Sequence, residues 1–107
     1  MAIKKAGVAD PKTFKAELDK KSAEKLKSWL LESLEESPHE EERVACFDMN
    51  SYTINAIEEV LQMFEKANWV VLRKEEYQFT YKVTSAMPQK PGDYKVQLND
   101  GKWKDIA

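Results

Sequence analysis

The sequence predicts a single α+β domain in which two or three helices pack on a mainly antiparallel sheet, in the order α-β-α-β-β-β-β. Three observations lead to this prediction. Residues 53–68 carry apolar side chains at helical spacing, residues 77–84 alternate apolar and polar side chains, and Asn99-Asp100-Gly101 is a hairpin-turn sequence between two short alternating stretches. Helical segments combined with strands joined by short turns are typical of this fold class.

The length and composition fit one domain spanning residues 1–107. A chain of 107 residues with 42% hydrophobic and 34% charged residues can bury a core without disulfides. Residues 1–9 lack periodicity and are predicted to form a loose N-terminal arm. No apolar run approaches the roughly 18 residues of a membrane span, the N-terminus has no signal-peptide pattern, and Cys46 is the only cysteine. We therefore expect a cytoplasmic protein that does not enter a membrane.

Charge is segregated along the chain although the net charge is only −2. Residues 1–27 carry +4, residues 28–65 carry −9 and residues 66–107 carry +3. Such blocks could create a bipolar surface that attracts a partner or a second copy, or folding could interleave them. The sequence leaves both outcomes open.

The region Thr53 to Leu72 is predicted to be the centre of the fold. Its apolar stripe indicates a helix with one buried face, preceded by side chains that can cap its first turn. The stripe consists of Ile54, Ile57, Val60, Leu61, Phe64 and Ala67. Asn68 is suited to the left-handed conformation that ends a helix. Trp69 to Leu72 are apolar at both strand parities, which predicts a strand in the centre of the sheet.

A long amphipathic helix is predicted to begin at Asp10-Pro11, where Asp can cap and Pro is favoured in the first turn. A break near Lys20-Lys21-Ser22 is one option, with Ser22 capping a second piece. This helix could offer more apolar surface than the sheet can cover, and so bind a protein partner or a second copy as a homodimer; the alternative is that it packs entirely within the monomer. The candidate interface residues are Leu26, Trp29, Leu30, Leu31 and Leu34.

The remaining segments with a pattern are expected to be strands or turns of the sheet. Residues 44–49 alternate, with Ala45, Phe47 and Met49 on one side, and predict a short strand. The charged step Arg73 to Glu76 is predicted to be a turn before the strand over residues 77–84. Residues 94–98 and 102–104 are predicted to form a hairpin around Asn99-Asp100-Gly101.

The sequence predicts no catalytic constellation, cofactor site or metal site. His39 and Cys46 are the only histidine and cysteine, too few for a dedicated zinc site, and no orienting third group marks them as a catalytic pair. We expect Cys46 to be a small core residue of its strand. The three glycines are far apart, so no phosphate-binding loop is present. The glutamates of the central helix are interpreted as solvated.

One stretch supports a functional alternative. Aromatic residues alternate along Tyr77 to Val83 with basic residues nearby, an arrangement that could stack single-stranded nucleic acid. The residues of this alternative face are Arg73, Lys74, Tyr77, Phe79, Tyr81 and Lys82. The same residues are better explained as the apolar face of a strand under helices, and a sequence pI near 5.5 argues against a nucleic-acid binder. Nucleic acid is therefore the less favoured partner.

The run from Asn50 to Leu72, in which a polar cap leads to a helix and then to Lys66-Ala67-Asn68-Trp69-Val70-Val71, resembles small accessory proteins of tailed bacteriophages. The resemblance covers about a fifth of the chain. It implies a role in host interaction, inhibition or particle assembly, in the cytoplasm of a host cell, and assigns no site residue. We therefore expect an accessory or inhibitory protein-binding protein that acts by surface contacts and is not an enzyme.

Overall fold

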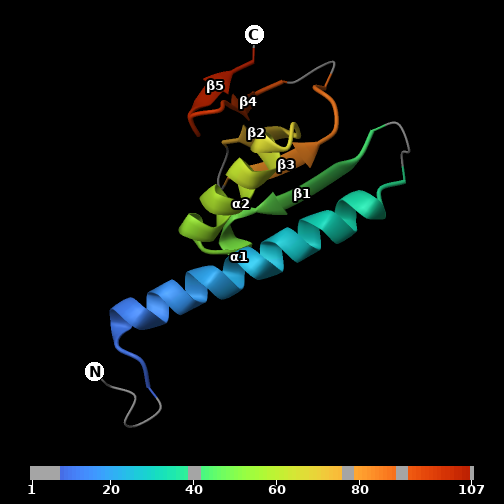
Figure 1. Cartoon of the computed structure of the whole chain (residues 1–107). Coiled ribbons are helices and arrows are strands. Elements are labelled where there is room, and N and C mark those ends of the chain that lie inside the picture. The colour runs from blue at the N-terminus through green and yellow to red at the C-terminus, as the bar shows by residue number, and fades with distance from the viewer. Residues whose placement is uncertain (1–7, 39–41, 76–78, 89–91, 107) are drawn as a thin grey trace.

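The computed structural model describes residues 8–38, 42–75, 79–88 and 92–106. It confirms an α+β fold in which two helices pack on a five-stranded antiparallel sheet (Figure 1). The elements follow in the order α1 (Pro11–Glu35), β1 (Val44–Asp48), the short 3-10 helix η2 (Met49–Ser51), α2 (Ile54–Lys66), β2 (Val70–Lys74), β3 (Thr80–Thr84), β4 (Tyr94–Gln97) and β5 (Trp103–Asp105). The described residues do not include Tyr77 of the alternative nucleic-acid face, His39, or the first seven residues of the predicted arm.

Helix α1 begins where the sequence predicted. The Asp10 side chain accepts hydrogen bonds from the backbone amide and the hydroxyl of Thr13, at 2.8 and 3.0 Å, and Pro11 occupies the first turn. The bonds from Thr13 hold the pKa of Asp10 below its ordinary value. The option of a break near Ser22 is wrong, because α1 is continuous and Ser22 is buried against the domain. The Ser22 hydroxyl instead accepts a hydrogen bond from the backbone amide of Thr53, the N-cap residue of α2, as described below.

The sheet order is β1-β3-β2-β4-β5, which confirms the central place of the strand after α2. The prediction of a turn at Arg73 is wrong, because both Arg73 and Lys74 pair within β2. Their partners on β3 and β4 extend this strand by two residues beyond its apolar run. The hairpin at Asn99 to Gly101 is confirmed, and Gly101 has the positive φ of 83° that such a turn requires.

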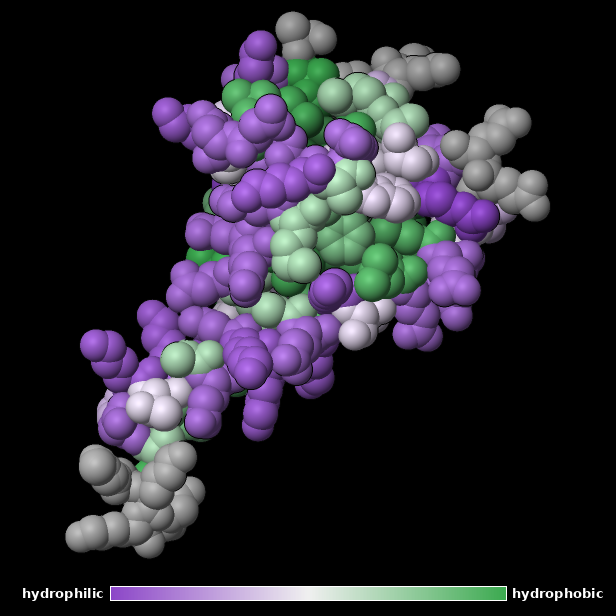
Figure 2. Space-filling view, in the orientation of Figure 1, coloured by the Kyte–Doolittle hydropathy of each residue, from purple (hydrophilic) through white to green (hydrophobic). Residues whose placement is uncertain are grey.

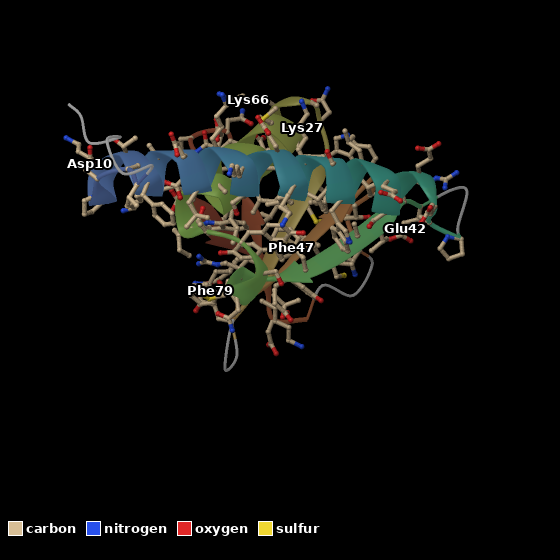
Figure 3. All side chains as sticks on the ribbon, turned by 90° about the horizontal axis from the view of Figure 1, so that it is seen from below. Asp10, Lys27, Glu42, Phe47, Lys66 and Phe79 are labelled. Atoms are coloured by element: carbon tan, nitrogen blue, oxygen red, sulfur yellow. The ribbon has the colours of Figure 1, made fainter. Side chains whose placement is uncertain are left out.

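Both helices pack on the same face of the sheet. That face presents Ala45 and Phe47 from β1, Tyr81 and Val83 from β3, and Val71 from β2, each of which is buried. The helices contribute Leu26, Leu30 and Leu34 from α1 and Ile57, Val60, Leu61 and Phe64 from α2. Seen from below, α1 crosses the molecule with Asp10 near one end and Phe47 beside its middle (Figure 3). The predicted buried stripe of α2 is confirmed at four positions, whereas Ile54 and Ala67 are exposed.

The first half of α1 projects from the rest of the domain. The molecule measures 55 × 28 × 26 Å along its principal axes, and the N-terminal part of α1 extends beyond the sheet and α2 (Figure 1). Buried residues of α1 begin only at Ser22, so none of residues 11–21 belongs to the core. The projecting half therefore exposes most of its surface to solvent or to a partner.

Candidate functional site

An open groove runs between α1 and the segment that connects β1 to α2. Its volume is about 1040 Å³, and its walls combine one side of α1 with residues 50–53. Leu18, Ser22 and Trp29 contribute from α1, and Tyr52 and Thr53 contribute from the opposite wall. The groove therefore forms where α1 passes the short connection of residues 50–53, which covers only part of that side of the helix.

Large apolar side chains are exposed along the groove side of α1. The exposed fractions are 57% for Phe14, 45% for Leu18 and 40% for Trp29. Phe14 and Leu18 are one turn apart, and the eleven positions from Leu18 to Trp29 amount to about three turns, so the three side chains form one row. In Figure 2 the projecting part of α1 is mainly hydrophilic, with smaller hydrophobic areas among the charged side chains. An aligned apolar row of this kind is typical of a helix that binds another surface.

Phe47 contacts one aromatic side chain in each wall of the groove. Its ring meets the ring of Trp29 edge-on with centroids 6.5 Å apart and that of Tyr52 edge-on at 5.8 Å. It also stacks on Tyr81 in the core at 5.2 Å. Because Phe47 is only 7% exposed, the positions of the two wall aromatics are fixed by the core.

Two polar contacts hold α1 against the start of α2 at the floor of the groove. The Ser22 hydroxyl accepts a hydrogen bond from the backbone amide of Thr53 at 3.0 Å. The Asp19 carboxylate accepts one from the Asn55 side chain, also at 3.0 Å. The hydrogen bond from Asn55, with a smaller contribution from Thr53, holds the pKa of Asp19 below its ordinary value. The floor is therefore pre-organised.

The structure separates the predicted interface residues of α1 into two groups. Leu26, Leu30 and Leu34 are 0 to 4% exposed and belong to the core. Trp29 and Leu31 are exposed, but only Trp29 lines the groove. Phe14 and Leu18 were missed as interface candidates, although their spacing with Trp29 is visible in the sequence, because the same spacing also fits a buried stripe.

The residues of the alternative nucleic-acid face are divided between the two faces of the sheet. Tyr81 is 5% exposed on the helix-covered face, and Phe79, just before β3, is partly buried against the same core. Arg73 lies opposite Tyr81 on this face, whereas Lys74 and Lys82 belong to the other parity and point away from the helices. Among the described residues, the two lysines therefore do not share a face with Phe79 and Tyr81.

Arg73 is held between two rings at the end of the core. Its guanidinium carbon lies 4.8 Å from the centroid of Phe79 and 4.7 Å from that of Trp103, and Nη2 donates to the Glu75 carboxylate at 2.7 Å. A polar cavity of about 210 Å³ adjoins it, and the described residues offer no hydrogen-bond partner to Arg73 Nε or to the buried Gln97 Oε1 there. Burial raises the pKa of the neighbouring Tyr81 phenol, an effect that the charge of Arg73 opposes.

The helix-free face of the sheet gathers two lysines around one tyrosine. Lys74 Nζ lies 5.9 Å and Lys82 Nζ 5.5 Å from the centroid of the Tyr94 ring. Cross-strand pairing produces this cluster, because β2 lies between β3 and β4. The sequence did not single out Tyr94, whose distance along the chain from Lys74 and Lys82 hides the contact.

Cys46 lies exposed on this second face and is not the core residue that its strand suggested. The strand parity was predicted correctly, but the helices cover the face of Ala45 and Phe47. Partial burial of the thiol raises the pKa of Cys46, and the charge of Lys82 opposes this effect. Among the residues that the structure describes, no three His, Cys, Asp or Glu side chains cluster as metal ligands would.

The described helices include none that is both long enough and apolar enough to span a membrane. In comparisons with known proteins, no family model matches the chain, and no curated protein or solved structure is significantly similar to it.

Proposed function

We propose that this chain is a small protein-binding module that acts by surface contacts and uses the groove side of α1 as its binding surface. The observation that carries the proposal is the row of Phe14, Leu18 and Trp29, three large side chains at 40 to 57% exposure along one side of a projecting helix. Single exposed apolar residues are ordinary, but an aligned row beside a pre-formed groove provides buried area for a partner. The accessory or inhibitory role implied by the phage resemblance needs a surface of this kind.

The groove also has the mixed character of a protein interface. Aromatic anchors at Trp29 and Tyr52 stand among exposed Lys25 and Glu32. Apolar and aromatic anchors with a charged rim are the usual anatomy of a specific interface. Because the anchors rest on Phe47, their side chains lose little freedom on binding.

A capture experiment tests this proposal with a matched control on the same helix. The full chain, immobilised through its C-terminus, is used to capture proteins from a native lysate, and Leu18→Glu is compared with Leu31→Glu. Both leucines are exposed, at 45 and 50%, but they lie about 140° apart around α1. We expect Leu18→Glu to lose the captured protein and Leu31→Glu to retain it, with both variants melting as the wild type does. Equal capture by all three proteins would contradict the assignment of the surface.

A second candidate function is binding of single-stranded nucleic acid by the helix-free sheet face. The convergence of Lys74 and Lys82 on the Tyr94 ring favours it, since lysines attract phosphates and a tyrosine can stack a base. Fluorescence anisotropy with a labelled single-stranded oligonucleotide is the test. Binding that falls steeply with salt, and that Lys82→Ala weakens more than Lys66→Ala on the exposed end of α2, would support it. No binding at low salt eliminates this candidate.

A further inference from the structure

The two halves of α1 carry opposite charge. Pro11 to Lys21 contain four lysines and two acids, a net charge of +2. Ser22 to Glu36, through the end of the helix, contain two lysines and four glutamates, a net charge of −2. The basic half projects from the domain, and the acidic half is the part that packs on the sheet (Figure 1).

We infer that the occupant of the α1 groove is a second copy of this chain, with the two α1 helices antiparallel. This inference rests on the proposed function, because it names the partner of the same surface. Antiparallel contact places the basic half of each helix against the acidic half of the other. Because the dimer has two-fold symmetry, this attraction occurs at two equivalent places. A parallel contact would place like charges together along both halves.

The distribution of apolar side chains fits the same arrangement. Phe14 and Leu18 lie in the projecting half, where no residue is buried by the chain itself. Trp29 and Tyr52 form the groove walls beside the packed half. When two helices run antiparallel, the projecting half of each lies along the groove of the other, so each copy supplies the apolar row and the groove that receives it. Neither copy can close its own groove in this way.

The first test is the mass of the full chain in solution. Light scattering at micromolar concentration should show a dimer. Phe14→Glu should weaken dimerisation by more than about tenfold, because it places a charge in the apolar row. Leu31→Glu, an exposed position outside the groove, should leave the dimer intact.

The second test uses charge to read the orientation of the helices. One variant changes Lys12, Lys15 and Lys21 to Glu, a second changes Glu32, Glu35 and Glu36 to Lys, and a third carries all six changes. All six side chains are exposed, so circular dichroism and melting should remain close to wild type. The first two variants should dimerise at least about tenfold more weakly, because each gives both halves the same sign. The six-fold variant should dimerise at least as strongly as the wild type, because antiparallel halves again have opposite signs.

Three results would overturn the inference. A monomer mass for the wild type removes the second copy, and the capture experiment with Leu18→Glu then decides the proposed function independently. A dimer that Phe14→Glu does not weaken places the contact elsewhere. A six-fold variant that dimerises more weakly than wild type excludes the antiparallel arrangement, because parallel helices would then repel along both halves.

Discussion

The Ser22 hydroxyl accepts a hydrogen bond from the backbone amide of Thr53, with an Oγ–N distance of 3.0 Å. Thr53 is itself the N-cap of α2, and its side chain accepts a hydrogen bond from the amide of Ala56 at 3.3 Å. One helix thus binds the residue that starts the other. This contact fixes the distance between α1 and the wall of the groove, so the shape of the proposed binding surface depends on it.

Ser22→Ala is expected to lower the free energy of unfolding by about 1–3 kcal/mol, because it leaves the partly buried Thr53 amide without its partner. Urea denaturation followed by circular dichroism measures this loss. Ser28→Ala, at an exposed position of the same helix, is the control and should change stability by less than about 0.5 kcal/mol. Equal stability of the two variants would show that water replaces the Ser22 hydroxyl at no cost.

Arg43→Ala is expected to destabilise the C-terminal end of α1. Arg43 Nη1 donates to the carbonyl oxygen of Ser37 at 2.8 Å and to that of Glu35 at 3.1 Å. Its positive charge also offsets acidic side chains at a helix end that favours cations. We expect a loss of about 1–2 kcal/mol in urea denaturation, with faster amide hydrogen exchange in the last turn. Unchanged exchange in that turn would show that the helix end does not depend on Arg43.

Arg73→Lys is expected to destabilise the domain although it keeps the charge. A planar guanidinium stacks between the rings of Phe79 and Trp103 while binding Glu75, whereas an ammonium group cannot fill that slot. We expect a loss of about 1–2 kcal/mol, which lowers the melting temperature by several degrees. Lys95→Arg, on the neighbouring strand, is a matched control for exchange of the two cations. A melting temperature of Arg73→Lys equal to wild type would mean that the stacking contributes nothing.

Cys46 is expected to react slowly at neutral pH although it is exposed. Its raised pKa lowers the fraction of thiolate, which is the reactive form, so alkylation by iodoacetamide should be slower than that of a free thiol and should accelerate as the pH rises toward the pKa. Lys82→Ala should slow the reaction further at a given pH, because loss of the positive charge raises the pKa. Asp48→Asn should accelerate it, because the charge of Asp48 raises the pKa. Mass spectrometry of the alkylated chain follows all three rates, and a faster Lys82→Ala reaction would contradict the electrostatic explanation.

The local elements were determined by the sequence because their signals lie within a few residues. Asp10 and Pro11 start α1 through contacts inside the first turn, and Asn68 ends α2 with a φ of 72°. The apolar run after α2 predicted a central strand because only a strand covered on both faces can use such residues. The turn expected at Arg73 was wrong, since pairing with β3 and β4 on both sides extends the strand through charged residues.

Only the tertiary structure decided which of these elements' side chains are available to a partner. The periodicity of α1 places Leu26, Leu30 and Trp29 on overlapping sides of the helix, but where the sheet ends determines that the two leucines are buried and that Phe14 and Leu18 project beyond it. Likewise, the alternating pattern of β3 places Tyr81 and Lys82 on opposite faces of the sheet, but it does not determine which of them faces the helices. The cluster of Lys74, Lys82 and Tyr94 depends on pairing between distant strands. Periodicity is a property of neighbouring residues, whereas exposure depends on what the rest of the chain has already covered.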